Sequence, residues 1–320
     1  MKNSVFMLAV TLASVCLPAL NRNASAADAP AKKEYRFVIV PKVVHPWFDK
    51  VNDGAKDAAK MLTDLTKTNV VVDYRAPQTA DVVVQNQILE SAISTKPDGL
   101  TLDLLDPDGN RPVLEEAKKQ KIPVVVFDSQ APKDMNLPSV GNDYHAQAEQ
   151  AAERLVKLLG GKGKVAIMQG VPTAPNHRIR AEAYRETFAK YPGIQVVAEG
   201  IDNDDIETAQ KEASSIISAH PDLNGFVECD AAGPIGVGIA IKEANKVGKI
   251  IEIGLDDLNQ LLDLISQGVV DSSVSTKPKM QGYWAVLALW QKAHGANLPD
   301  RIDTGVVTIT KDMIKSYQGF

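Results

Sequence analysis

The sequence predicts an α/β fold in which parallel β-sheets carry helices on both faces. Short apolar runs alternate with amphipathic stretches along most of the 320 residues, and strands separated by helices pair in parallel. Two of the runs, residues 37–40 and 124–127, are apolar throughout, which is typical of strands buried on both faces. A chain of this length is expected to form two domains of ordinary size.

The first residues are expected to be an export signal rather than part of the fold. Lys2 gives a positive start, residues 5–20 form an apolar run, and Ala24-Ser25-Ala26 offers a small-residue cleavage site. The run is short for a membrane-spanning helix, which needs about 20 residues. We therefore predict a signal peptide at 1–26, a tether at 27–33 and a periplasmic location. An uncleaved anchor or a lipid on Cys16 is favoured less by the flanking residues.

The first series of elements starts with the apolar run at 37–40. Pro41 is expected to end this strand because proline donates no backbone hydrogen bond. Asp49 is expected to cap the helix that follows. The remaining expected elements of this series are a strand at 70–74, a helix at 81–94, a strand at 100–104, a helix at 112–120 and a strand at 124–127.

A second series of the same kind begins after Asp143. Gly160-Gly161 is typical of a helix end, because glycine readily adopts the left-handed conformation found there. The expected helices of this series are 146–159, 180–190, 206–219, 235–245 and 280–293. The expected strands are 164–168, 195–199, 226–228, 250–255, 269–275 and 306–309.

The composition and the missing motifs exclude several classes of function. A formal net charge of −5 gives no electrostatic footprint for nucleic acid. The sequence has no phosphate-binding loop, no dinucleotide-binding glycine motif after a strand and no nucleophile elbow. Gly233-x-x-Gly236-x-Gly238 falls inside a predicted helix, where close packing explains it better. The five histidines show no metal-ligand spacing. We therefore predict no enzymatic activity, no cofactor, no bound metal and no nucleic-acid partner.

Polar residues recur at the carboxyl ends of the predicted strands. In an open parallel sheet these ends converge on one crevice, which is where ligands bind. Carboxylates accept hydrogen bonds from hydroxyl groups, and lysine and arginine donate to oxygens, so such a ring suits a small polyhydroxylated ligand. The aromatic faces of Trp47 and Phe48 would stack on the C–H face of a sugar. The strand-end residues are Lys42, Asp103, Asp128, Asn176, Cys229, Asp230, Asp256 and Thr276.

The opening of the chain resembles the ribose-class, type I periplasmic sugar-binding proteins of ABC importers. The resemblance starts with a strand followed by His45-Pro46-Trp47-Phe48 and a helix containing Asp53-Gly54-Ala55. It implies two doubly wound parallel-sheet lobes joined by a three-segment hinge, with crossings near Asn142, Thr276 and Gly305. The implied amino-terminal lobe is 34–141 plus 277–304, and the implied carboxyl-terminal lobe is 142–276 plus 305–320.

The resemblance also implies a set of ligand-binding residues. Asp128 and Asp256 fall where the family places sugar-binding aspartates, and the segment from Gly170 has the length that makes Arg180 the ligand-binding arginine. The sequence departs from the family's pattern at Ser129, where the family has arginine, and at Cys229, where the family has asparagine. Thr276 falls where glutamine is common. The full predicted set is Lys42, His45, Trp47, Phe48, Asp128, Ser129, Asn176, Arg180, Cys229, Asp230, Asp256 and Thr276.

Several of these residues also have structural explanations. Trp47 and Phe48 could pack in the core at a helix start, and Asp128 and Asp256 could cap helices. Arg180 could lie on the surface, and Lys42 could be solvated at a loop edge, as lysine usually is. His45 is expected to be structural or at the rim of the site, because a lone histidine is a weak signal. For Cys229 we expect a small, buried, apolar role.

The predicted function is that of an extracytoplasmic solute-binding protein. It would capture a sugar or sugar alcohol between two lobes, as a monomer, and deliver it unchanged to a membrane ABC permease. An alternative comes from Lys42 and Asp128-Ser129, which also resemble the autoinducer-2-binding branch of the family. On that hypothesis the protein is a receptor for an autoinducer-2-like furanone or for a chemotaxis signal, with the same fold and no catalysis.

Overall fold

A computed structural model describes residues 32–317 of the chain. The predicted signal peptide at 1–26, and all but the last two residues of the predicted tether, lie outside the described residues. Among the helices of the described range, none is both long enough and apolar enough to cross a membrane.

Two six-stranded sheets form the centre of the structure, and their strands follow the same spatial order. The first sheet contains β1 (Glu34–Val40), β2 (Asn69–Tyr74), β3 (Gly99–Leu102), β4 (Val124–Phe127), β5 (Ser139–Gly141) and β11 (Arg301–Asp303), in the order β2-β1-β3-β4-β5-β11. The second contains β6 (Lys162–Gln169), β7 (Gly193–Ile201), β8 (Gly225–Glu228), β9 (Ile251–Leu255), β10 (Ser272–Ser275) and β12 (Val307–Thr310), in the order β7-β6-β8-β9-β10-β12. The described pairings are parallel except for β10 with β12, so the predicted α/β class is confirmed.

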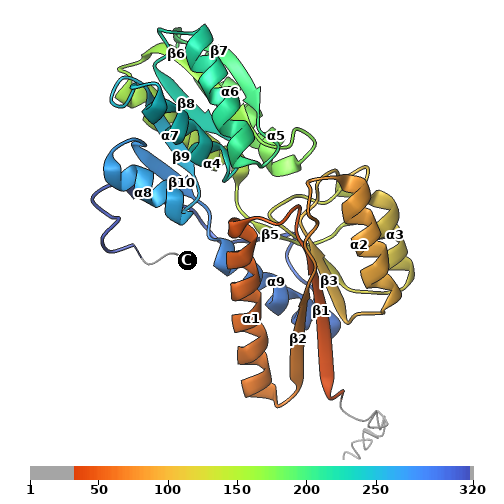
Figure 1. Cartoon of the computed structure of the whole chain (residues 1–320). Coiled ribbons are helices and arrows are strands. Elements are labelled where there is room, and N and C mark those ends of the chain that lie inside the picture. Colours follow the sequence, from red (N-terminus) through yellow and green to blue (C-terminus); the bar gives the residue numbers. More distant parts are fainter. Residues whose placement is uncertain (1–31, 318–320) are drawn as a thin grey trace, which may run out of the picture. The chain divides into compact units, whose positions relative to one another are not determined.

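Helices connect the strands and cover the sheets (Figure 1). They are α1 (Pro46–Thr66), α2 (Val82–Ser94), α3 (Arg111–Lys119), α4 (Tyr144–Leu158), α5 (Pro175–Ala189), α6 (Ile206–Ala219), α7 (Gly233–Glu243), α8 (Asn259–Gln267) and α9 (Pro278–Ala293), with a short 3₁₀ helix at Lys133–Met135. Helix α9 follows the second sheet in the chain but packs against α1 and the first sheet. We call the first sheet with α1, α2, α3 and α9 the first lobe, and the second sheet with α4 to α8 the second lobe.

Both faces of the first sheet are buried, as its continuous apolar strands predict. Phe37 and Ile39 of β1 pack on the side of α1 and α9, whereas Val38 and Val40 pack on the side of α2 and α3. All four side chains are fully buried. Burying a side chain of this size contributes roughly 1.5–3 kcal/mol relative to leaving it in water. The alternation therefore anchors the sheet from both faces.

Two glycines explain how closely the helices approach one another. A Cβ atom on Gly54 of α1 would overlap the backbone oxygen of Lys279 in α9, so only glycine allows this contact. A Cβ atom on Gly236 of α7 would lie 2.5 Å from the Cβ of Ala209 in α6. Gly236, which belongs to the glycine motif noted in the sequence, therefore lets two helices pack closely, as predicted.

Helix α1 begins earlier than the sequence suggested. Asp49 was expected to be the capping residue, but His45 holds that position, and its Nδ1 atom accepts a hydrogen bond from the backbone N–H of Trp47 at 3.2 Å. Pro46 starts the helix because its fixed φ suits the first turn and its missing N–H costs nothing there. Asp49 lies within the first turn, where its charge complements the helix dipole.

Three of the α-helices and β-strands were not expected from the sequence. Strands β5 and β11 have three residues each, which is too few to show a pattern of apolar residues in the sequence. The two strands pair with one another. Helix α8 has nine residues and lacks a side-chain hydrogen bond at its N-cap, Leu258. The strand expected at 269–275 is shorter and begins at Ser272. Short elements of this kind depend on their tertiary neighbours rather than on local pattern.

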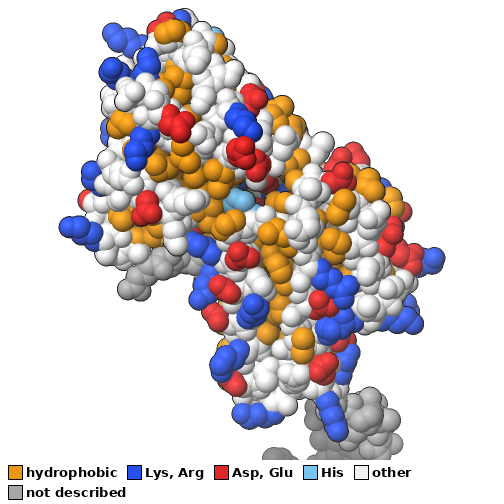
Figure 2. Space-filling model, viewed as in Figure 1, with side chains coloured by type: hydrophobic (Ala, Val, Ile, Leu, Met, Phe, Trp, Pro, Cys, Tyr) orange, Lys and Arg blue, Asp and Glu red, His pale blue; other side chains and the backbone are white. Residues whose placement is uncertain are grey.

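Charged side chains of both signs are interspersed on the face of the molecule shown in Figure 2. No large patch of a single sign is visible on that face. This distribution agrees with the mildly acidic composition, and the face shown offers no positive surface that would track a phosphate backbone.

Candidate functional site

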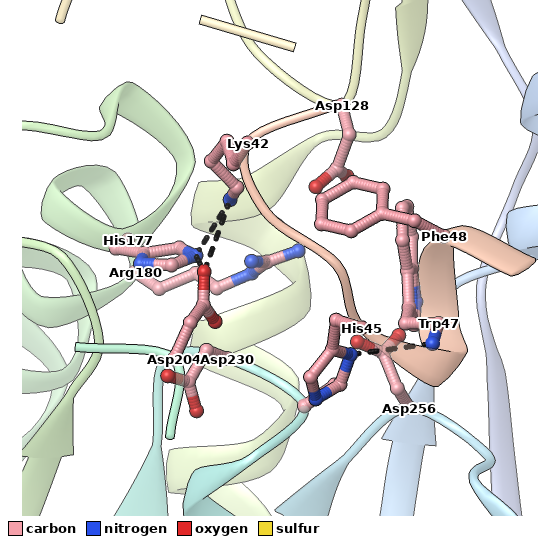
Figure 3. Close-up of a pocket in the computed structure, with 11 residues that line it drawn as sticks. Lys42, His45, Trp47, Phe48, Asp128, His177, Arg180, Asp204, Asp230 and Asp256 are labelled. Carbon is pink, nitrogen blue, oxygen red and sulfur yellow. Dashed lines mark hydrogen bonds and ion pairs between the residues drawn. The ribbon is translucent and has the colours of Figure 1, made fainter. Parts of the chain in front are cut away.

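One pocket collects side chains that follow strands in both lobes (Figure 3). The space in and around it, part of which is open to solvent, is about 260 Å³. The contributing segments are the loops after β1, β4, β7, β8 and β9, together with α1 and the first turns of α5. The lining residues are Lys42, His45, Trp47, Phe48, Asp128, His177, Arg180, Asp204, Asp230, Ala231 and Asp256. Eight of these eleven belong to the set predicted from the sequence.

Asp128 and Asp256 directly follow β4 and β9, which hold equivalent places in the two sheets. Both have a left-handed backbone, with φ of 45° and 70°. Aspartate tolerates this conformation better than most residues, because its short side chain can hydrogen-bond locally. Neither residue caps one of the described helices, which removes that explanation for them. Both carboxylates instead face the pocket.

Burial affects the protonation of both carboxylates. It raises the pKa of Asp128, although the charges of Lys42 and Arg180 oppose the rise. Burial also raises the pKa of Asp256 to about 6, against the charge of Arg180 and a hydrogen bond from Thr276. A carboxylate at this depth needs partners to stay ionised, so the nearby cations are essential to the site.

Arg180 supplies a fixed positive charge to the pocket. Its side chain is only 2% exposed, so the surface explanation is wrong for this residue. Its Nε atom donates to Oε1 of Gln147 at 3.1 Å, and Nη1 donates to the backbone oxygen of Cys229 at 3.0 Å. Its guanidinium lies 4.9 Å from the ring centre of Tyr144. These contacts hold the group rigidly, and its planar fork suits oxygen-rich ligands.

Lys42 is also buried, at 2% exposure, so it is not a solvated loop residue. Its Nζ atom lies 2.9 Å from Nε2 of His177, 3.5 Å from Oδ2 of Asp103 and 3.8 Å from Oδ2 of Asp204. Burial lowers the pKa of Lys42, but the surrounding aspartates outweigh it and leave the pKa above its usual value. Lys42 therefore stays charged at neutral pH, although it makes one close contact and several long ones.

The aromatic side of the pocket comes from the start of α1. The rings of Trp47 and Phe48 are 5.0 Å apart and meet nearly edge to face, at 84°. Both rings are buried and line the pocket. His45 caps α1 and also lines the pocket, so it has both a structural and a site position. Within the described residues, Nε1 of Trp47 and Nε2 of His45 have no hydrogen-bond partner.

Four predicted site residues lie outside the pocket lining. Ser129 accepts a hydrogen bond from the backbone of Leu104 and donates to that of Phe127, so its hydroxyl serves the loop. Thr276 donates to the carboxylate of Asp256 through its hydroxyl and its backbone N–H. Their direct contact with a ligand stays a prediction, and the structure gives them positions behind the lining.

The other two are Asn176 and Cys229. Asn176 donates to Oδ2 of Asp128 at 2.7 Å, which joins α5 of the second lobe to the end of β4 in the first. Cys229 is fully buried among the residues packed under α4 and α5, as expected for a small apolar side chain. Burial raises the pKa of its thiol well above the usual value, so it stays protonated and unreactive.

Three lining residues were not predicted: His177, Asp204 and Ala231. Asp204 lies in the acidic loop between β7 and α6, where Asp202, Asp204 and Asp205 follow a strand. That run of acids at a strand's carboxyl end was a usable signal. His177 is next to the predicted Asn176, and no pattern in the sequence distinguished it. Burial lowers the pKa of His177 well below its usual value, and the charge of Lys42 lowers it further.

The side chains of His177, Asp204 and Asp230 offer atoms within 4.8 Å of one another, a spacing that a metal ion could use. The ammonium of Lys42 lies 2.9 Å from His177 and 3.8 Å from Asp204, however, and already places a positive charge there. A divalent ion would have to displace it. The donor set therefore fits an ammonium-centred cluster better than a metal centre.

Comparison with known proteins gives a consistent result. A family model described as "Periplasmic binding protein domain" matches residues 36–297. The xylose/arabinose-binding protein of Sulfolobus acidocaldarius is 24% identical over 91% of this chain and 74% of its own length. The D-ribose/D-allose-binding protein of Pseudomonas aeruginosa is 24% identical over 96% of this chain and 97% of its own length.

A solved structure extends the likeness to three dimensions. The solute-binding protein of an ABC transporter from Burkholderia graminis, in complex with D-arabinose, superposes with a TM-score of 0.83 and 31% identity. The match covers 90% of this chain and 98% of that one. The predicted fold of two parallel-sheet α/β lobes is thereby confirmed.

Proposed function

Because the chain belongs to the family of periplasmic binding protein domains, we propose that it is a receptor for a small neutral sugar or sugar alcohol. It captures this solute between its two lobes outside the cytoplasm and hands it unchanged to a membrane ABC permease. Members of the family bind solutes without transforming them, so the chain is not an enzyme.

The observation that carries the proposal is the chemical make-up of the pocket. Four aspartates, two fixed cations and two aromatic rings line one pocket. Hydroxyl groups satisfy such a set, because each can donate to a carboxylate and accept from a lysine, an arginine or an N–H group. A hydrogen bond to a charged group contributes about 1.5–3 kcal/mol, so a few of them suffice for micromolar binding, about −8 kcal/mol.

The twelve predicted residues divide into two roles in this proposal. Those that line the pocket contact the sugar, with Trp47 and Phe48 as the apolar platform. Ser129, Asn176, Cys229 and Thr276 hold the lining residues in place from behind. Asn176 acts on Asp128, and Thr276 acts on Asp256.

Closure of the lobes is the second part of the proposal. The chain passes between the sheets after β5, after β10 and between β11 and β12, close to the predicted crossings at Asn142, Thr276 and Gly305. Asn142 donates to the backbone oxygen of Gly305 at 2.7 Å, which ties two crossings together. We place the lobe boundaries at 34–141 plus 277–304 and at 142–276 plus 305–320. Hinge bending at these crossings would let the ligand enter and leave.

The remaining parts concern location and partners. An export signal at 1–26 would deliver the protein to the periplasm, where it would act as a monomer. The permease would then recognise the closed form through surfaces of both lobes. Relatives from Sulfolobus acidocaldarius and Pseudomonas aeruginosa are named for binding pentoses and hexoses, which supports a monosaccharide as ligand.

The test is a thermal-shift and calorimetric screen of neutral monosaccharides and sugar alcohols, with uronic acids and an autoinducer-2-type furanone in the same panel. A sugar at 100 times its Kd should add about 2.7 kcal/mol of stability. The matched variants are Asp256→Asn in the pocket and Asp108→Asn, whose side chain is 95% exposed. We expect the shift to fall to about half or less in the first and to be kept in the second. Binding of the furanone alone would favour the signalling hypothesis, and no binding in the panel would contradict the proposal.

A further inference from the structure

His177 is held in one protonation form by its surroundings. The backbone N–H of Val171 donates to Nδ1 of His177 at 2.8 Å. An amide N–H is only a donor, so Nδ1 carries no proton. A neutral imidazole has a single N–H, which must then be on Nε2. Burial keeps the pKa of His177 well below its usual value, so the ring is neutral at pH 7 and Nε2 is a donor.

The Nε2 atom faces another donor. Nζ of Lys42 lies 2.9 Å away, and an ammonium has three N–H groups and no acceptor. The contact therefore brings two donors together without an acceptor between them. The third neighbour is Oδ2 of Asp204, which lies 3.8 Å from Nζ of Lys42 and 3.9 Å from Nε2 of His177. Within residues 32–317 this carboxylate oxygen makes no hydrogen bond.

The charges of the three groups are defined. Asp204 is ionised at pH 7: burial raises its pKa, but nearby positive charge, including that of Lys42 3.8 Å away, lowers it to about 2. Lys42 is charged, because nearby aspartates keep its pKa above the usual value. The cluster thus offers two donors and one acceptor around a common point, and all three side chains line the pocket (Figure 3).

The geometry suits one oxygen atom. A triangle with sides of 2.9, 3.8 and 3.9 Å is small enough for an atom above its plane to lie at ordinary hydrogen-bond distance, about 2.8 Å, from all three corners. A hydroxyl group accepts two hydrogen bonds and donates one, which is what the corners require. A carboxylate oxygen would accept from Lys42 and His177 but repel Asp204. A C–H group would leave the N–H of His177 and Oδ2 of Asp204 without a partner, whereas Lys42 would keep its contacts with Asn176 and Asp103.

We propose that Lys42, His177 and Asp204 together recognise one hydroxyl group of the sugar and reject analogues that lack it. The inference rests on the proposed function and names residues that specify the ligand of the same site. Lys42 comes from the first lobe, whereas His177 and Asp204 come from the second. The three corners meet only when the lobes are together, so the recognised hydroxyl also bridges the closed form.

The test uses a neutral sugar that binds in the screen together with its monodeoxy analogues. Examples are D-ribose with 2-deoxy-D-ribose and D-galactose with 6-deoxy-D-galactose. We expect one hydroxyl position to be distinguished, with its deoxy analogue bound at least about 10³-fold more weakly by the wild type, because sites built to pair a hydroxyl reject its absence strongly. For each hydroxyl position, the ratio of the Kd of the deoxy analogue to the Kd of the sugar measures discrimination. In Lys42→Met and His177→Phe this ratio should fall at least tenfold at the distinguished position. At the other positions it should stay within about threefold of the wild-type value.

Lys50→Met is the matched control. Lys50 also joins the two lobes, through Asp257 at 2.8 Å, but does not line the pocket. It should keep the deoxy ratio of the wild type. If Lys42→Met and His177→Phe lower every ratio equally, or leave all of them unchanged, the inference is wrong although the protein binds sugar. If no sugar binds to the wild type, the proposed function itself fails.

A measurement on the wild-type protein alone keeps the inference testable if the variants do not fold. The ¹⁵N chemical shifts of the His177 ring, at pH 7 and without sugar, distinguish the two neutral forms. We expect the proton on Nε2, and addition of the bound sugar should shift that resonance most. A proton on Nδ1 and none on Nε2 would make Nε2 an acceptor for Lys42, remove the donor pair and overturn the inference.

Discussion

Asp128 and Asp256 have equivalent positions in the two lobes, yet they are held differently. Each follows the fourth strand of its sheet, counted from β2 or β7, and each has a left-handed backbone. Asp128 accepts hydrogen bonds from Asn176 of the second lobe and from Gln281 of α9. Asp256 accepts from the backbone and hydroxyl of Thr276, which follows the neighbouring strand β10.

The same position in the two sheets therefore carries an aspartate that contacts both lobes in one case and a single lobe in the other. The carboxylate of Asp128 is tied to both lobes, so its contacts change when the lobes separate. The carboxylate of Asp256 is held within the second lobe and keeps its contacts in any closure state. We therefore expect Asp128 to report on closure and Asp256 to report on local binding. Four experiments would test or sharpen this comparison, given from the largest expected effect to the smallest.

Arg180→Met removes the cation that both aspartates share. It leaves Asp128 and Asp256 without their common counter-charge and deprives Gln147 of a buried donor, so we expect a loss of about 3–5 kcal/mol in the free energy of unfolding. Urea unfolding at pH 7 measures this loss. Arg178→Met, at a neighbouring and half-exposed arginine, should change stability by no more than about 0.5 kcal/mol. Equal effects at both arginines would show that the shared charge is unimportant.

Asp128→Ala and Asp256→Ala should each weaken sugar binding by about 1.5–3 kcal/mol, roughly 10- to 150-fold, because each removes a charged acceptor. Titration calorimetry gives the affinity. The two variants should differ in closure, which small-angle X-ray scattering follows. Without sugar, Asp128→Ala should have a larger radius of gyration than the wild type, and Asp256→Ala should match the wild type. Identical scattering of the two variants would contradict the comparison.

The pH dependence of stability should carry the signature of Asp256. Its folded pKa of about 6 is higher than the usual value of 3.8, so between these values the folded state holds a proton that the unfolded state has lost. The stabilisation from this group is complete below about pH 4 and disappears as the pH rises through 6. Asp256→Asn should remove this change, on the order of 1–3 kcal/mol, from urea-unfolding curves at pH 4 to 7. The same curves for Asp108→Asn should keep it.

Thr276→Val should have the smallest effect and should act on one aspartate only. It removes the hydroxyl donor but leaves the backbone N–H on the carboxylate of Asp256. We expect a loss of about 0.5–1.5 kcal/mol and a further rise in the pKa of Asp256, which ¹³C NMR of the carboxyl group would follow. The pKa of Asp128 should stay unchanged. A shift at both sites would mean that the two lobes are coupled electrostatically at this position.

Much of this arrangement could be predicted from the sequence because it depends on local rules. Continuous apolar runs bounded by turns gave the central strands, and the aspartates directly after β4 and β9 were expected at the crevice. Trp47 and Phe48 were expected beside them, because they open the helix after β1. In a parallel sheet every strand end faces the same edge, so these positions follow from the order of strands and helices alone.

The tertiary structure alone decided which polar side chains meet. Cys229 and Asp230 are neighbours after β8, yet the first packs under α4 and α5 and the second faces the pocket. Lys42 lies more than 130 residues before His177 and Asp204 in the chain. These side chains meet only because the strand ends of the two lobes come together. Local pattern fixes where a strand ends, but the direction of the next side chain and its partner across the crevice depend on how whole lobes pack.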